Sequence, residues 1–225
     1  MRNYILIWFL ILPLGLVGQS QASIGILPEV NVSYRWADKW RFTGQIESMQ
    51  RSWNKPAAEG LIWDYEYVRT DFTSALSYKL NPEWTLGTGY MLRFQDGEVV
   101  HRFIQQVSSA SKKGSVRIGH RLRTDETFTA LESPEWRFRY RFSIEVPLNG
   151  LSINDREWYA LASAEALGRV QQSDFSYEQR AVFSLGYNIN SANKIETGFD
   201  YRLDRFLDSA PRHRLWYTVS YFLNL

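Results

Sequence analysis

Three arginines stand at alternate positions of residues 135–146, whose sequence is EWRFRYRFSIEV. Arg137, Arg139 and Arg141 share one parity with three further polar residues, whereas every residue of the other parity is aromatic or aliphatic. Successive side chains of a β-strand point to opposite faces, so this segment predicts a strand with one charged and one apolar face. Guanidinium groups bind carboxylates and oxyanions through paired hydrogen bonds. The chemistry that this row predicts is therefore ion pairing or anion binding.

The same alternation recurs along the chain, and its polar parity is rich in arginine, aspartate and glutamate. If the apolar parity faces lipid, the charged parity faces the inside of a barrel. The simpler interpretation is a network of salt bridges that fills a narrow lumen. The functional interpretation is a pore whose arginines favour anions. We expect this lumen charge network to comprise Arg117, Arg121, Arg123, Arg137, Arg139, Arg141, Arg180, Arg202, Glu145, Glu178, Glu196 and Asp200.

Nucleophilic catalysis has weaker support. The chain has three histidines, His101, His120 and His213, and none is followed two residues later by a serine that would share its strand face. His120 stands on the otherwise apolar parity, so the alternative function is a lipid-modifying hydrolase or acyltransferase with this histidine as its base. Three isolated histidines without cysteine do not form a zinc pattern, and no phosphate loop or dinucleotide fingerprint occurs. We predict no enzymatic activity, no metal and no cofactor.

The charged rows need strands to position them. Period-2 segments recur from about residue 29 to the last residue and give about eleven recognisable strands. Each is close to the roughly 9–11 residues that a tilted membrane-spanning strand requires. Tight turns are predicted at Asn81-Pro82 and at Asp96-Gly97. A further short strand within residues 24–28 would bring both chain ends to one side, so we expect 10–12 strands and favour twelve.

The expected fold class is all-β, as a single transmembrane, antiparallel, up-and-down β-barrel with a charged lumen. A soluble β-sandwich or lipocalin-like barrel also alternates, but its apolar face would be the inner one and its arginines would lie outside. Tryptophans near strand ends, among them Trp36, Trp84, Trp136 and Trp158, are typical of the aromatic girdles of membrane barrels. The apolar alternation of residues 215–225 also favours the membrane interpretation.

The beginning of the chain predicts export. Arg2 precedes an apolar run at residues 4–17, and small residues follow, so residues 1–22 are predicted to be a signal peptide cleaved after Ala22. The run is shorter than the roughly 20 residues of a spanning helix. Residues 23–225 would form the barrel as one domain. The formal net charge of the 225 residues is +2, which gives no support to nucleic-acid binding.

Several of these segments resemble a known family. The runs at residues 120–126 (HRLRTDE), 137–141 (RFRYR) and 175–180 (FSYEQR), followed by a tyrosine-rich last strand, are similar to the DUF2490 family of bacterial outer-membrane β-barrels. The resemblance covers nearly all of the mature chain. It implies the barrel fold and a place in the outer membrane of a Gram-negative bacterium, and the family is frequent in Bacteroidetes. It supplies no catalytic residues, because no activity is assigned to the family.

The expected function is that of a structural or accessory barrel, or of a small pore with an arginine-rich lumen. Its expected partners are outer-membrane lipids, the barrel-assembly machinery that inserts it, and an anionic solute if the lumen conducts. The alternating last strand resembles the signal that this machinery recognises, although it ends in Leu225 and not in an aromatic residue.

Overall fold

The computed structural model describes residues 21–56, 60–130, 132–205 and 211–225. Within these ranges the chain is all-β, and no helix there is long and apolar enough to cross a membrane. Eleven strands follow one another: β1 (Gln21–Ala37), β2 (Trp40–Lys55), β3 (Ile62–Lys79), β4 (Trp84–Gln95), β5 (Glu98–Lys113), β6 (Val116–Phe128), β7 (Glu135–Pro147), β8 (Glu157–Gln171), β9 (Asp174–Asn188), β10 (Asn193–Asp204) and β11 (Arg212–Asn224).

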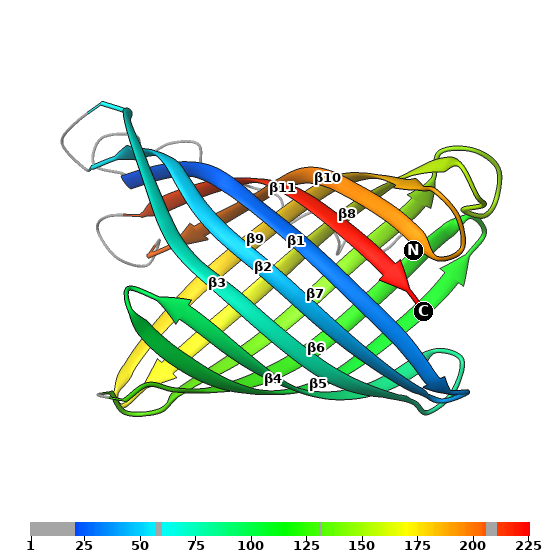
Figure 1. Cartoon of the computed structure of the whole chain (residues 1–225), viewed down its shortest axis with the longest axis horizontal. Helices are drawn as coiled ribbons and strands as arrows, with labels where there is room; N and C mark the ends of the chain where they lie inside the picture. The colour runs from blue at the N-terminus through cyan, green and yellow to red at the C-terminus, as the bar shows by residue number, and fades with distance from the viewer. Residues whose placement is uncertain (1–20, 57–59, 131, 206–210) are drawn as a thin grey trace, which may run out of the picture.

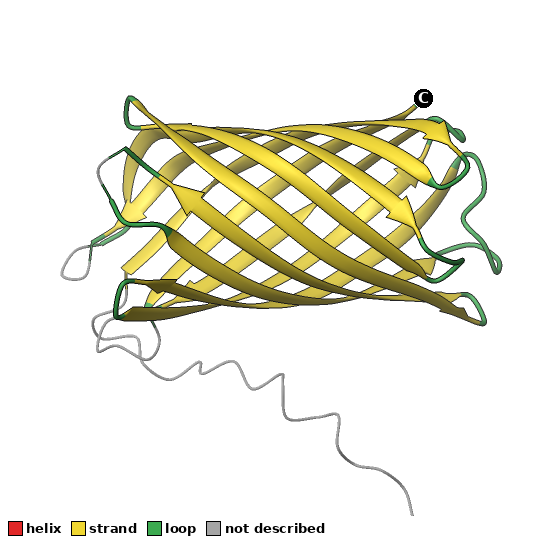
Figure 2. Cartoon of the chain, turned by 90° about the horizontal axis from the view of Figure 1, so that it is seen from below, coloured by secondary structure: helices red, strands yellow, loops and turns green. Residues whose placement is uncertain are grey.

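The strands form one closed barrel in which each strand pairs with its neighbours in the chain (Figure 1). The strands run obliquely to the barrel axis, and the connections lie at its two ends (Figure 2). The barrel closes where β1 pairs with β11, from Gln21 opposite Arg212 to Ser33 opposite Asn224. A closed sheet has no free edge, so every strand can satisfy its backbone groups on both sides. The prediction of an all-β barrel is confirmed.

Two details differ from the prediction. The described residues form eleven strands, within the expected 10–12 but not the favoured twelve, and residues 24–28 continue β1 instead of forming a strand of their own. The β1–β11 pair is parallel, so the barrel is not antiparallel throughout. In an up-and-down barrel with an odd number of strands, the first and last strands run in the same direction. The start of β1 and the end of β11 therefore lie at opposite ends of the barrel, and one parallel pair closes it without a twelfth strand.

The predicted signal peptide falls mostly on residues 1–20, which lie outside the described residues. Its last two residues, Gln21 and Ala22, are the first residues of β1 and stand opposite Arg212 and His213.

The hairpin predicted at Asp96-Gly97 joins β4 to β5. Asp96 has φ of 53° and Gly97 has φ of 78°, so both central residues adopt the left-handed conformation of a type I′ turn. Glycine has no Cβ, and aspartate tolerates positive φ better than most residues, so this pair suits the turn.

The barrel is apolar outside and charged inside, as the alternation predicted. Large hydrophobic side chains lie exposed on the outer wall, including Trp36 at 67%, Phe183 at 60% and Phe138 at 54%. Among the described residues, eleven polar or charged side chains are buried, against eight hydrophobic ones. A soluble domain has the opposite arrangement, with a hydrophobic interior.

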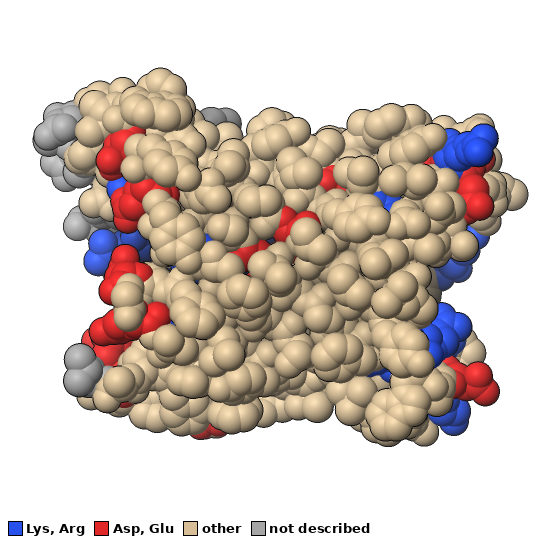
Figure 3. All heavy atoms as spheres, in the orientation of Figure 1, with Lys and Arg blue, Asp and Glu red and all other residues tan. Residues whose placement is uncertain are grey.

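On the side of the barrel shown in Figure 3, charged side chains gather at the two ends, and the outer face between them is largely uncharged. The left end in Figure 1 holds the start of β1 and the β2–β3, β4–β5, β6–β7, β8–β9 and β10–β11 connections. The right end holds the end of β11 and the other five connections. Acidic residues predominate at the left end and basic residues at the right end (Figure 3).

Candidate functional site

All twelve residues predicted for the lumen charge network lie on the inward parity of their strands. They come from β6, β7, β9 and β10, where they alternate with outward residues such as Leu122, Phe138 and Phe199. Six of them belong to one connected network in the barrel. Arg202 pairs with Asp200, Arg137 pairs with Glu135, and three residues stand apart.

Glu165 on β8 is the centre of the connected network. Its carboxylate accepts hydrogen bonds from Arg139, with Nε at 3.0 Å and Nη2 at 2.5 Å, and from Arg141 Nε at 2.8 Å. Arg121 Nη2 lies 3.4 Å from it and Arg180 Nη1 lies 3.9 Å from it. Only 1% of the Glu165 side chain is exposed, so four guanidinium groups surround one buried carboxylate. A buried charge needs such partners, because water no longer solvates it.

Further carboxylates extend this network around the wall. Arg139 reaches Asp125 at 3.6 Å, and Arg180 Nε donates to Glu178 at 2.5 Å. Arg214 then bridges Glu178 at 3.0 Å and a third buried carboxylate, Asp204, at 2.5 Å. The ion pairs form a continuous chain across β6 to β11, which ties these strands together on the inside.

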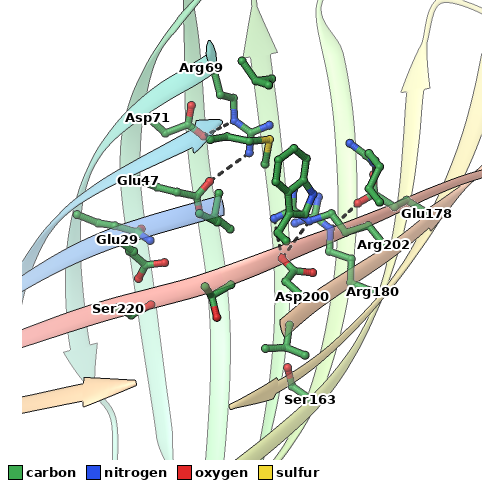
Figure 4. A pocket seen from close by; sticks show the side chains of 18 of the residues that line it. Glu29, Glu47, Arg69, Asp71, Ser163, Glu178, Arg180, Asp200, Arg202 and Ser220 are labelled. Carbon is green, nitrogen blue, oxygen red and sulfur yellow. Dashed lines mark hydrogen bonds and ion pairs between the residues drawn. The ribbon is translucent and has the colours of Figure 1, made fainter. Parts of the chain in front are cut away.

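The opposite wall has a second group of ion pairs (Figure 4). Arg93 donates to both oxygens of Asp71, with each distance 2.8 Å, in the bidentate geometry that guanidinium and carboxylate favour. Arg69 links Asp71 at 3.2 Å to Glu47 at 3.1 Å. A separate pair on β10 joins Arg202 to Asp200 at 2.6 Å.

Three predicted residues stand apart, toward the right end. Arg117 is 61% exposed and lies 3.6 Å from Glu145, which makes a weak ion pair. Glu196 accepts a hydrogen bond from the Tyr159 hydroxyl at 2.7 Å and lies 3.4 Å from Lys194. These residues face the lumen but do not join the network around Glu165.

The prediction missed several members of the network. Glu165 lies on β8, where the outward residues from 160 to 166 are all alanine, so no large apolar residue marked the outer face, while Leu161 and Leu167 share the inner face with Glu165. The sequence did contain a signal for the face of Glu165, because alanine occupies every second position from 160 to 166 and Glu165 lies on the other parity. The other missed arginines that face the lumen are Arg51, Arg102, Arg169, Arg212 and Arg214, whereas Arg69 and Arg93 face the lumen as the alternation of their strands predicted.

The lumen encloses a cavity of about 990 Å³, lined by residues near both ends, from Lys55 and Arg212 at the left to Lys194 and Phe222 at the right. Its described lining has sixteen arginine and lysine side chains and seven aspartate and glutamate side chains. The most deeply buried carboxylates, Asp125, Glu165 and Asp204, lie behind the arginines and do not line it. The surface that a solute would meet is therefore strongly positive.

The histidines lie on the outer wall, each paired with a tyrosine of the neighbouring strand. His101 Nδ1 lies 2.5 Å from the Tyr90 hydroxyl, and His120 Nδ1 lies 2.8 Å from the Tyr140 hydroxyl. His213 Nδ1 lies 2.7 Å from the Tyr201 hydroxyl. Such a pair satisfies two polar groups on an apolar wall. Among the described residues, no group of three or more His, Asp or Glu side chains is arranged to hold a metal ion.

Comparison with known proteins agrees with the predicted resemblance. No curated protein and no solved structure matches the chain. A family model described as "Protein of unknown function (DUF2490)" matches residues 24–220, which span the barrel from β1 into β11. The chain therefore belongs to the DUF2490 family.

Proposed function

We propose that the protein is an outer-membrane β-barrel of a Gram-negative bacterium, exported through a cleaved signal peptide, and that its arginine-lined lumen is a small pore for anions. The proposal has two parts, the place in the membrane and the preference for anions, and they rest on different observations.

The distribution of side chains supports the membrane part. Large hydrophobic side chains cover the outer wall, and charged residues lie inside and at the two ends (Figure 3). The strands are 12 to 18 residues long, enough to cross the hydrocarbon core at a steep tilt. In water, the apolar wall would be a very large hydrophobic surface, which soluble monomers avoid.

The charge of the lumen supports the anion part and is the observation that carries the proposed function. Sixteen cationic and seven acidic side chains line the cavity, so a small anion would enter a positive potential. Rings of arginine and lysine are the usual device for anion preference in pores. The cavity lining reaches from one end of the barrel to the other, as a conducting path requires.

Conductance of the refolded protein in a planar bilayer, under a salt gradient, tests both parts. We expect discrete, steady channels whose reversal potential has the sign of anion preference. Arg139 and Arg141 sit at the centre of the network, so Arg141→Gln should reduce the anion preference without abolishing conductance. The control is Arg156→Gln, which also removes one positive charge. Arg156 lies in the connection between β7 and β8 and does not line the cavity. A folded, inserted barrel that does not conduct would refute the pore and leave a structural barrel.

A further inference from the structure

Two arginines that line the lumen cavity have no carboxylate within 4 Å among the described residues, although Asp125 and Asp71 attract one of them, Arg102, from farther away. Arg102 on β5 is 4% exposed, and its guanidinium donates to the Thr127 hydroxyl at 2.8 Å and contacts the Met91 sulfur at 3.8 Å. Arg169 on β8 makes no ion pair with the described residues, and its buried Nε has no hydrogen-bond partner there. Every other arginine that lines the cavity lies within 4 Å of at least one carboxylate, so these two differ from them.

A third arginine, Arg137 on β7, is only weakly matched. Its side chain is 8% exposed, Glu135 lies 3.5 Å away, and its buried Nε makes no hydrogen bond to the described residues. The strongest electrostatic interactions of its guanidinium with other side chains are repulsions from Arg102, Arg139 and Arg180, and the attraction of Glu135 is weaker.

These three arginines are close together in the sheet. Arg137 and Arg169 stand directly opposite each other on β7 and β8, and Arg102 lies on β5, with only β6 between it and β7. All three line the lumen cavity. They lie in the half of the barrel nearer the left end, because Thr127 and Glu135, at the left ends of β6 and β7, are their neighbours.

We propose that Arg102, Arg137 and Arg169 form a binding site for a small tetrahedral oxyanion, specifically inorganic phosphate. Buried cations are costly unless an opposite charge compensates them, and here the protein supplies too few carboxylates. A tetrahedral oxyanion offers several acceptor oxygens and more than one negative charge, which suits guanidinium groups that approach from different strands. Chloride has neither property, so the site prefers phosphate to chloride.

This site deepens the proposed function and rests on the same positive lumen, since it is the point where a permeating anion would be held. Its existence does not require conduction, because a lumen closed at one end would hold phosphate equally well. Binding is therefore measured on protein in detergent micelles, without a membrane or a potential.

The test is isothermal titration calorimetry of the refolded barrel with inorganic phosphate, at an ionic strength held constant with chloride. We expect one phosphate per barrel. Arg169→Gln should weaken binding by about tenfold to a hundredfold, because a charge-assisted hydrogen bond is lost. The matched control is Arg35→Gln on β1 near the right end, which removes another arginine without an ion pair to the described residues and should leave the affinity unchanged.

Folding of each variant is checked by circular dichroism and by the shift of the folded barrel on unheated gels. If Arg169→Gln does not fold, Arg169→Lys keeps the charge, loses the guanidinium fork and should show a smaller loss of affinity. Absence of phosphate binding by the folded wild-type barrel overturns the site, and so does unchanged affinity in a folded Arg169 variant. Phosphate binding without conductance would refute only the pore, and conductance without phosphate binding would refute only the site.

Discussion

The ion-pair network makes a specific prediction about stability, because one carboxylate serves four arginines. Glu165→Gln keeps the shape of the side chain and removes its charge. Arg139 and Arg180 would retain second carboxylates, Asp125 at 3.6 Å and Glu178 at 2.5 Å. Arg121 and Arg141 would lose their ion pair with Glu165 and gain no other.

The expected magnitude follows from the burial of these groups. Removing one partner of a buried ion pair costs about 3–5 kcal/mol, because the other charge stays buried and unpaired. Arg121 and Arg141 are 27% and 33% exposed, so water screens part of their charge. We therefore expect the lower end, a loss of about 3 kcal/mol in the free energy of unfolding.

The assay is denaturant unfolding of the refolded barrel in detergent, followed by tryptophan fluorescence. The control is Glu145→Gln, whose partner Arg117 is 61% exposed at 3.6 Å, and its loss should be about 0–1 kcal/mol. Adding Arg141→Met to Glu165→Gln should recover part of the lost stability, because it removes one of the uncompensated charges. Equal losses for Glu165→Gln and Glu145→Gln would refute the view that Glu165 holds the network together.

Three further predictions concern other parts of the barrel. Gly186→Ala would place a Cβ 2.2 Å from the Tyr159 ring, so we expect a loss of about 1–3 kcal/mol in unfolding free energy, whereas Gly44→Ala, whose Cβ would meet nothing within 4 Å, should be neutral. Phe199→Arg, on the outer wall midway along β10, should make the free energy of folding into lipid vesicles less favourable by about 2–4 kcal/mol. Equal folding free energies for the variant and the wild type would contradict a lipid-facing wall. His120→Ala should leave conductance unchanged, and loss of a lipid-modifying activity on this substitution would favour the enzyme alternative.

The inner and outer faces could be predicted because a strand has a strict period of two. In β7, the arginines at 137, 139 and 141 specify one face, and Trp136, Phe138 and Tyr140 specify the other. The same reasoning fails where a parity is mixed. On β5, Val100, Arg102 and Ile104 share the inward face, while His101, Phe103 and Gln105 face outward, so neither face is purely polar or apolar. This is why Arg102 was not among the predicted residues.

The strand count could not be fixed by local patterns, because closure is a contact between the two ends of the chain. Side-chain alternation in β1 and β11 is the same whether these strands pair with each other directly or through a twelfth strand. The direct parallel pairing, with Gly25 opposite Trp216, is a property of the whole barrel. An added Cβ on Gly25 would lie 2.5 Å from the Trp216 ring, so this glycine provides space for the indole inside the lumen.

The network also explains why the formal net charge of the chain does not predict the charge of the lumen surface. The chain has 26 basic and 24 acidic residues, yet the cavity lining is strongly positive. Aspartate and glutamate have short side chains that stay close to the wall, where Asp125 and Glu165 are almost fully buried. Arginine has a longer side chain that reaches over them, so its guanidinium forms the surface of the cavity. The lumen already holds more basic than acidic side chains, and the difference in side-chain length places the positive charge still nearer the axis, so a nearly neutral chain can present an anion-attracting lumen.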